Sequence, residues 1–213
     1  MNDENLNHEP LLIVVSSPSG AGKTSVCKKI LENNNSIQIS ISATTRKPRQ
    51  NETDGIDYNF ISRDDFQNKI DNSQFLEYAE VFDNLYGSLI KDVEKITKSK
   101  KDVLFDIDWQ GTQQLYRSKS NNLVSIFILP PSKDEIENRL RKRKVESGDD
   151  ESIINQRMSK FKDELSHWAE YDYVIINDNL ENCVEKIFNI INVERKKRHR
   201  QIDLVGKVRD LTS

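Results

Sequence analysis

The segment from Ser17 to Thr24 has the residue types and the spacing that bind phosphate groups. It nearly matches the pattern Gly-x-x-x-x-Gly-Lys-Ser/Thr, and it follows a predicted strand and begins a predicted helix, as this motif requires. Glycines let several backbone N–H groups face one anion, and the helix N-terminus adds a favourable field. We therefore expect a nucleotide-binding loop formed by Ser17, Pro18, Ser19, Gly20, Ala21, Gly22, Lys23 and Thr24.

Two residues of this loop and one outside it are candidates for contact with phosphate or metal. Lys23 is expected to reach the β- and γ-phosphates, and the Thr24 hydroxyl to ligate Mg²⁺. Ser17 stands where the pattern has glycine, so the sequence leaves the backbone conformation open at that corner. Asp106 ends an apolar run and would lie beside the loop, where it could hold Mg²⁺, directly or through water, or cap the next turn. Its spacing leaves both interpretations open.

Short apolar runs alternate with helical patterns along the chain. Such runs indicate buried parallel strands, so the alternation predicts an α/β fold with a parallel sheet covered by helices. The expected strands are residues 11–15, 103–107, 123–129 and 173–176. The expected helices are residues 24–32, 90–99, 133–144, 153–167 and 180–194.

Two stretches interrupt this alternation. Residues 40–88 are polar and rich in turns, which is typical of an inserted substrate-binding segment; turns are predicted at Lys47-Pro48 and Asp54-Gly55, and a partly exposed strand through Ile56, Tyr58 and Phe60. Residues 139–157 run from a basic helix end through an acidic turn into another helix, as a lid would. We expect core segments at 10–41, 90–138 and 161–195, an insert at 42–89, a lid at 139–160, and polar tails at 1–9 and 196–213.

The composition is that of a soluble globular protein of 213 residues, 35% of them hydrophobic. A formal charge of -3 gives no overall attraction to nucleic acid or to anionic membranes. The polar first ten residues lack a signal-peptide core and no apolar run could span a bilayer, so we expect a cytoplasmic protein. Cys27 and Cys183 are predicted to be reduced core residues, and the basic run at 195–200 a solvated helix end rather than a nucleic-acid site.

Arg46 and Arg49 flank a proline turn, so their two guanidinium groups could point at one phosphate. Their surroundings resemble the guanylate kinase family in the order and spacing of five motifs, and the likeness runs from about residue 11 to residue 194. The motifs are Ser-x-x-Thr-Arg-x-Pro-Arg at 42–49, Gly-Ile-Asp-Tyr-Asn-Phe at 55–60, Phe-Leu-Glu-Tyr-Ala at 75–79, Tyr-Gly-Ser at 86–88 and Asp-Ile-Asp-x-Gln-Gly at 106–111.

The resemblance implies a phosphate-loop nucleoside monophosphate kinase with a GMP-binding insert and a lid. It implies transfer of the γ-phosphoryl group of ATP to GMP, and also to dGMP, with Mg²⁺ as cofactor, in purine nucleotide metabolism. By the same likeness, the GMP phosphate is held by Arg46, Arg49, Tyr58 and Tyr86, and guanine by Ser42, Glu77, Ser88 and Asp108.

The chemistry of the two carboxylates agrees with this implied role. Guanine presents N1–H and N2–H₂ donors, which Glu77 or Asp108 could accept, whereas adenine has no such edge. A site whose buried acceptors stay unpaired with the wrong base can discriminate by about 10⁴ or more. Without the family likeness, the residues alone favour ordinary core aromatics at Tyr58 and Tyr86, and a solvated helix residue at Glu77.

Three arginines resemble the lid arginines of the family. Arg139 and Arg143 lie four apart on one face of a predicted helix, and Arg157 lies beyond the acidic turn. With Lys23 and Arg46 they form the expected catalytic set, since positioning and charge neutralisation dominate phosphoryl transfer. A charged surface helix is the simpler interpretation of these arginines. Asn177 resembles a residue near the donor adenine, although a strand-ending turn explains it nearly as well.

Two other functions fit parts of the sequence. Guanylate-kinase-like domains of scaffold proteins bind phosphorylated partners without catalysis, but they typically have a degraded loop, whereas Lys23 and Thr24 are present here. A kinase for another small phosphate ester could use the same core, and Glu77 and Asp108 argue instead for guanine. The sequence gives no indication of the oligomeric state.

Overall fold

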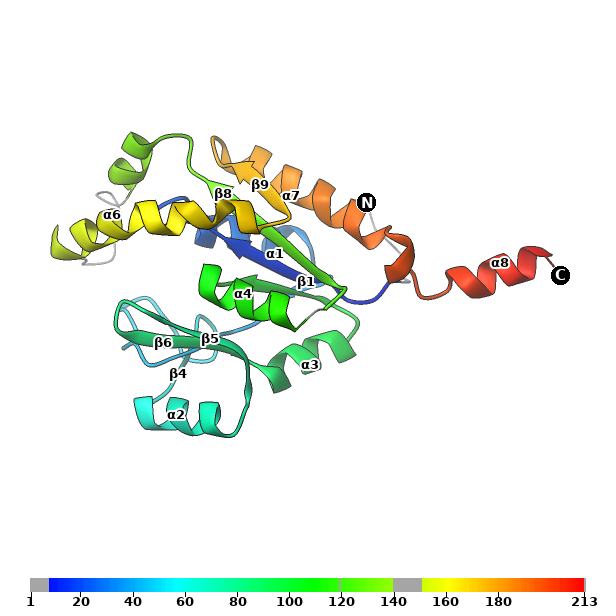
Figure 1. Cartoon of the computed structure of the whole chain (residues 1–213), viewed down its shortest axis with the longest axis horizontal. Coiled ribbons are helices and arrows are strands. Elements are labelled where there is room, and N and C mark those ends of the chain that lie inside the picture. Colours follow the sequence, from blue (N-terminus) through cyan, green and yellow to red (C-terminus); the bar gives the residue numbers. More distant parts are fainter. Residues whose placement is uncertain (1–7, 119, 140–150, 213) are drawn as a thin grey trace.

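The computed structural model of the chain describes residues 8–118, 120–139 and 151–212, with residues 151–157 described only as helical backbone. A five-stranded parallel sheet forms its centre, with strand order β2-β7-β1-β8-β9 (Figure 1). The four predicted strands are confirmed as β1 Leu12–Ser16, β7 Asp102–Asp106, β8 Leu123–Leu129 and β9 Tyr173–Ile176. The edge strand β2, Ile37–Ile39, was not predicted because three residues are too few to form a pattern.

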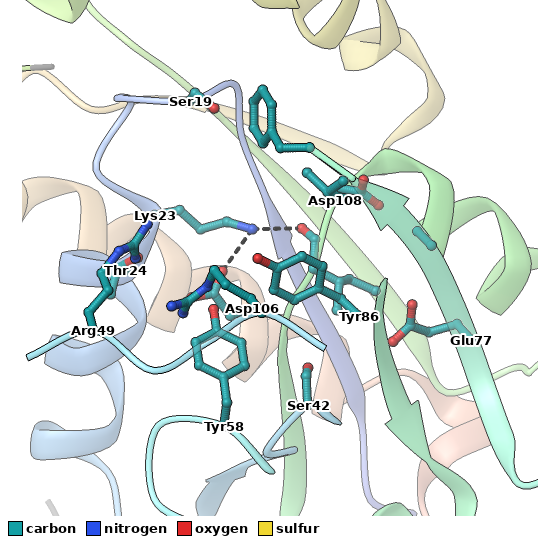
Figure 2. A pocket seen from close by; sticks show the side chains of 15 residues that line it. Ser19, Lys23, Thr24, Ser42, Arg49, Tyr58, Glu77, Tyr86, Asp106 and Asp108 are labelled. Carbon is teal, nitrogen blue, oxygen red and sulfur yellow. Dashed lines mark hydrogen bonds and ion pairs between the residues drawn. The ribbon is translucent and has the colours of Figure 1, made fainter. Parts of the chain in front are cut away.

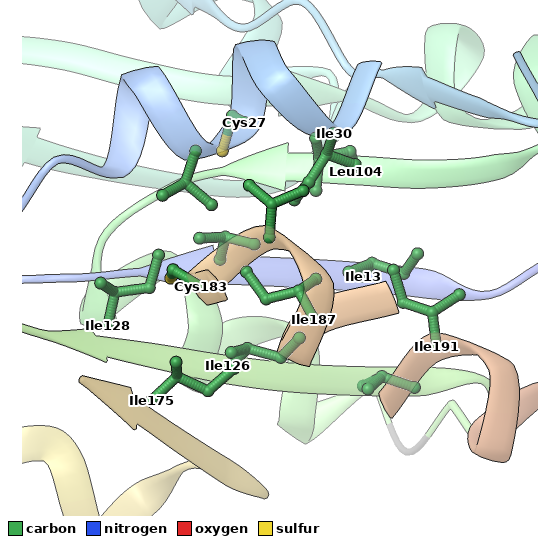
Figure 3. Close-up of a cluster of buried hydrophobic side chains, with 14 of the residues drawn as sticks. Ile13, Cys27, Ile30, Leu104, Ile126, Ile128, Ile175, Cys183, Ile187 and Ile191 are labelled. Carbon is green, nitrogen blue, oxygen red and sulfur yellow. The ribbon is translucent and has the colours of Figure 1, made fainter. Parts of the chain in front are cut away.

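Helices on both sides of the sheet bury its two faces (Figure 1). Their bounds are α1 Lys23–Asn33, α3 Ile90–Lys98, α4 Trp109–Arg117 and α7 Leu180–Arg195. On one face, α1 and α7 contribute Ile30 and Ile187 to an apolar cluster that also contains Cys27 and Cys183 (Figure 3). On the other face, α3 and α4 pack against Phe105. The α/β fold is therefore confirmed, and both cysteines are free and buried, as predicted.

A second, smaller sheet carries the region predicted as an insert. Its strand order is β4-β3-β6-β5, and its elements are β3 Ala43–Thr44, β4 Asn59–Phe60, α2 Arg63–Asp71, β5 Phe75–Val81 and β6 Asn84–Leu89. The strand expected through Ile56, Tyr58 and Phe60 is confirmed only at its end, as β4; Ile56 lies in a turn, where its N–H donates to the Thr53 carbonyl (3.2 Å). Pairing with β3 begins only at Asn59. The boundaries of the insert remain predictions.

The region predicted as a lid is described in part. Residues 133–139 are helical, followed after the undescribed residues 140–150 by α6 Glu151–Ser166 and the short helix η1 His167–Glu170. Ile136 packs against Met158 and Phe161, which holds the two helices together. Arg143 lies outside the described residues, and Arg157 is described only as part of α6.

The basic run near the C-terminus is exposed at residues 196–199, as predicted, but its first and last arginines are buried, contrary to the prediction. Arg195 and Arg200 are only 7% and 3% exposed. Arg195 pairs with Asp102 of β7 at 2.8 Å, and Arg200, in the short helix η2 Arg198–Arg200, pairs with Glu194 and donates to the Asn121 carbonyl at 3.0 Å. Asp102 and Asn121 are far away in the sequence, so the run of basic residues does not reveal them.

Beyond these contacts, helix α8, Leu204–Thr212, extends away from the body (Figure 1). Its apolar residues are exposed, with Val205 at 72% and Leu211 at 79%. No helix in the described ranges is both long and apolar enough to cross a membrane.

The buried pair of Asp102 and Arg195 is expected to contribute strongly to stability. Asp102→Ala would leave the Arg195 guanidinium and the Leu11 N–H, which Asp102 accepts at 2.8 Å, buried without this partner. Breaking such a pair costs about 3–5 kcal/mol. We expect a loss of that size in the free energy of unfolding in urea. Glu94→Ala, in the exposed pair with Lys98, is the control and should cost less than about 1 kcal/mol; equal losses would contradict the argument.

Candidate functional site

The predicted phosphate loop connects β1 to α1. Gly20 and Gly22 have φ of 87° and 96°, which favours glycine at both positions. A larger residue would not fit at Gly22, because its Cβ would lie 2.6 Å from Asn177 Nδ2. Ser17 is not among the residues with positive φ, and its hydroxyl donates to the Pro18 carbonyl at 2.9 Å. The missing glycine at that corner therefore causes no backbone strain.

Side chains from two other segments hold the back of the loop. Asn177, which follows β9 and is 5% exposed, donates its amide N–H to the Ala21 carbonyl at 2.8 Å. Arg139 donates to the same carbonyl at 3.3 Å, and Glu135 accepts from its Nε at 2.8 Å. The structure thus brings Asn177 and Arg139 to the loop, with Asn177 supporting its backbone rather than ending a solvated turn.

Lys23 Nζ and Asp106 Oδ1 form an ion pair of 2.8 Å at the carboxyl end of β7 (Figure 2). Lys23 Nζ also donates to the Ile107 carbonyl at 2.9 Å. Burial opposes the charged ammonium, but Asp106 outweighs this and raises the pKa of Lys23 above its usual value. The turn after β7 is capped by another residue, Asp108, which accepts from Gly111 N–H at 3.1 Å. The Asp106 carboxylate therefore faces the loop and does not serve as the cap of this turn.

Two adjoining cavities meet at Lys23. One is lined by the phosphate loop together with Arg139 and Glu164. The other lies over the second sheet and is lined by predicted acceptor residues, namely Ser42, Arg46, Arg49, Tyr58, Glu77, Tyr86 and Asp108 (Figure 2). The residues that line both cavities are Ser19, Lys23, Thr24, Val81, Phe82 and Asp108. Two ligands bound in these cavities would meet at the shared wall.

The two arginines of the second cavity are held by Glu52. Arg46 NH1 and NH2 each donate to a Glu52 oxygen at 2.8 Å, and Arg49 donates its backbone N–H to Glu52 Oε2 at 2.8 Å. Burial opposes ionisation of Glu52, yet the bonds from Arg46 and Arg49 lower the pKa of this carboxyl. The Arg46 guanidinium also lies 5.3 Å from the centroid of the Tyr58 ring, and the Tyr58 and Tyr86 rings are 5.9 Å apart. Arg46, Tyr58 and Tyr86 therefore lie together on one wall of the cavity.

Glu77 and Ser88 face each other across the pairing of β5 with β6. Within the described part of the chain, Glu77 Oε1 and Ser88 Oγ are buried without a hydrogen-bond partner, although Glu77 is only 3% exposed. Burial and the nearby charge of Asp108 raise the pKa of Glu77 to about 7, although the Ser88 hydroxyl and backbone N–H and the charge of Lys23 act in the opposite direction. A buried acceptor that lacks a partner is costly, so Glu77, which lines the cavity, is suited to a ligand that donates hydrogen bonds.

Gly111 allows Glu77 to occupy this position. A Cβ at Gly111, in the first turn of α4, would lie 2.3 Å from Glu77 Oε2. The glycine of the Asp-Ile-Asp-x-Gln-Gly motif therefore leaves space for the carboxylate of Glu77, which belongs to a separate strand. Glu77 is a strand residue in β5 and not a solvated helix residue, so the simpler interpretation of the sequence is wrong at this position.

The site residues that sequence reasoning missed include Glu52, Phe82 and Glu164. Glu52 is a turn residue without an identifying pattern, and Phe82 lies at the tip of the β5–β6 hairpin with φ of 49°. Glu164 comes from α6, more than 140 residues after the loop that it contacts. Among the predicted residues, Ser88 lies buried beside Glu77 but does not line the cavity.

Comparison with known proteins agrees with this geometry. Residues 9–194 match the family model described as guanylate kinase. The guanylate kinase of Zymomonas mobilis is 48% identical over 94% of this chain and 92% of that protein, and that of Maricaulis maris is 50% identical over 89% and 86%. The crystal structure of guanylate kinase from Anaplasma phagocytophilum matches with a TM-score of 0.79 and 35% identity, covering 94% of both chains. This chain therefore belongs to the guanylate kinase family.

Proposed function

We propose that this chain is an ATP:GMP phosphotransferase, with ATP in the cavity of the phosphate loop and GMP in the cavity over the second sheet. The observation that carries this assignment is the shared wall at Lys23. A single cavity would support only nucleotide binding or hydrolysis. Two cavities that meet at one cationic side chain suit transfer of a phosphoryl group from one ligand to the other.

The acceptor cavity matches the chemistry of GMP at both ends. Arg46 and Arg49 offer guanidinium groups to its phosphate, with hydroxyl groups from Tyr58 and Tyr86 beside them. At the other end, Glu77 accepts from the N–H groups of guanine. The residues assigned to GMP are assigned to its phosphate or to its guanine, so dGMP is also expected to be an acceptor.

The reaction needs no general base, because the attacking GMP phosphate oxygen is already anionic at neutral pH. This oxygen forms a bond to the γ-phosphorus as the bond to the β–γ bridging oxygen breaks, and ADP leaves. Lys23 moves from Asp106 to the donor phosphates and neutralises charge there. Arg139, and with it Arg143 and Arg157 of the predicted lid, would add cationic groups worth on the order of 10³–10⁵ in rate.

Thr24 and Asp106 are the residues suited to Mg²⁺. Both line the acceptor cavity close to Lys23, and Mg²⁺ in kinases uses one or two protein oxygens together with substrate phosphates and water. The described residues contain no group of three or more carboxylate, histidine or cysteine side chains that could hold a metal alone, which suits an ion that arrives with ATP. When bound, Mg²⁺ neutralises phosphate charge. Cytoplasmic location and a role in purine metabolism remain predictions.

A coupled assay of ADP release tests this function. ATP and Mg²⁺ are supplied with GMP, dGMP, AMP, UMP or CMP as acceptor, and turnover is expected with GMP and dGMP. Turnover with AMP at the rate of GMP would contradict the role of Glu77, and no turnover with GMP would contradict the assignment as a whole.

A further inference from the structure

Glu164, on helix α6, contacts the phosphate loop directly. Its Oε2 accepts from Ser19 N–H at 2.8 Å, and its Oε1 accepts from the Ser19 hydroxyl at 3.5 Å. The side chain lines the donor cavity, while Ser19 lines both cavities. A carboxylate of the donor cavity therefore holds Ser19, which belongs to the wall shared by both cavities, where the proposed function places the transferred group of ATP.

The loop is built to bind an anion, and a carboxylate is one. The N–H groups at the start of α1 lack intrahelical partners, and the helix N-terminus favours negative charge. A γ-phosphate at this boundary would compete with Glu164 for Ser19 N–H and would be repelled by its charge. ATP and the observed position of Glu164 are therefore mutually exclusive, whereas ADP, which lacks the γ-phosphate, would leave this contact in place.

The same face of α6 also reaches the second sheet. Lys160, one helical turn before Glu164, has its ammonium 4.6 Å from the centroid of the Phe82 ring. Phe82 and Asp83 form the tip of the β5–β6 hairpin, with φ of 49° and 62°. Helix α6 thus contacts the loop through Glu164 and the hairpin through Lys160.

We propose that Glu164 occupies the γ-phosphate position in the nucleotide-free protein, and that ATP, but not ADP, displaces it and so moves α6. Glu164 acts here as a positioning residue that couples the donor to the helix following the predicted lid. The inference rests on the proposed assignment of the loop to ATP. It differs from that assignment in predicting that removal of an acidic residue strengthens donor binding.

Titration calorimetry with ATP and Mg²⁺, and separately with ADP and Mg²⁺, tests the inference in the absence of GMP. Burial raises the pKa of Glu164, so the measurements are made at about pH 8 to keep the carboxylate ionised. Glu164→Gln is expected to lower the Kd for ATP by roughly tenfold and to change the Kd for ADP by less than about twofold. Asp163→Asn, which removes an exposed charge from the neighbouring position, should change neither.

Three results would overturn the inference: unchanged ATP affinity in Glu164→Gln, weaker ATP affinity, or equal strengthening for ATP and ADP. Fluorescence of Trp168, directly after α6, provides a second readout. ATP should alter it in the unmodified protein more than in Glu164→Gln, and equal changes in both would also count against the inference. If neither protein bound ATP, the assignment of the loop would fail instead, which separates the two hypotheses.

Discussion

Lys23→Ala is expected to lower kcat by about 10²–10³-fold. The ammonium is the cation at the shared wall of the two cavities, where charge must be neutralised as the phosphoryl group moves. Asp106 keeps it protonated by raising its pKa, so neutral pH does not remove this charge. In the variant, Asp106 would also lose its partner at 2.8 Å and add a free negative charge beside the phosphates.

Steady-state assays with saturating ATP and GMP measure this effect, and urea unfolding checks that the fold survives. Lys28→Ala is the matched control, because Lys28 lies exposed on the same helix and should change kcat by less than about twofold. A kcat within threefold of the unmodified protein in Lys23→Ala would contradict the role of the ammonium. A loss in Lys28→Ala of similar size would instead indicate an effect on the helix.

Residues that follow one another in the chain are the part of the site that sequence reasoning could predict. The phosphate loop is such a segment, since its strand, turn and helix adjoin and each residue type has a local reason. The buried strands could be predicted equally well, because a continuous apolar run indicates a buried strand even when its neighbouring strands are not known. Helix α4 was missed, although its start carries the motif with Asp108, because its first turn contains Gly111, a residue that is unfavourable inside a helix.

Contacts between distant segments could not be predicted in the same way. Glu164 reaches Ser19, and Arg195 reaches Asp102, across more than 90 residues, and nothing near either acid identifies its partner. The buried state of Glu77 depends on Gly111, which belongs to another element. A charged residue is usually exposed, so the sequence predicts a solvated side chain for each of these acids. Only the tertiary structure shows which carboxylates are buried.

The affinity for GMP is expected to fall as the pH is lowered through about 7, and Glu77 is the cause. Its pKa is raised from the usual value to about 7 by burial, with Asp108 adding to the shift and Lys23 opposing it. The N–H groups of guanine require the ionised carboxylate, whereas the protonated form presents a donor to them. The ionised fraction falls about tenfold between pH 8 and pH 6 for a pKa of about 7, so the Kd for GMP should rise by about that factor.

Glu77→Gln separates this effect from the titration of the GMP phosphate, whose second pKa of about 6 lies in the same range. The variant retains the phosphate contacts of Arg46 and Arg49 and lacks the Glu77 carboxylate, whose pKa of about 7 lies in this range. Its Kd for GMP should be about 10–100-fold higher at pH 8, the cost of a lost charged hydrogen bond, and its pH dependence should be that of the phosphate alone. Its Kd for ATP should stay unchanged. Parallel pH profiles for the two proteins would assign the whole dependence to the phosphate and would remove Glu77 as the group that selects guanine.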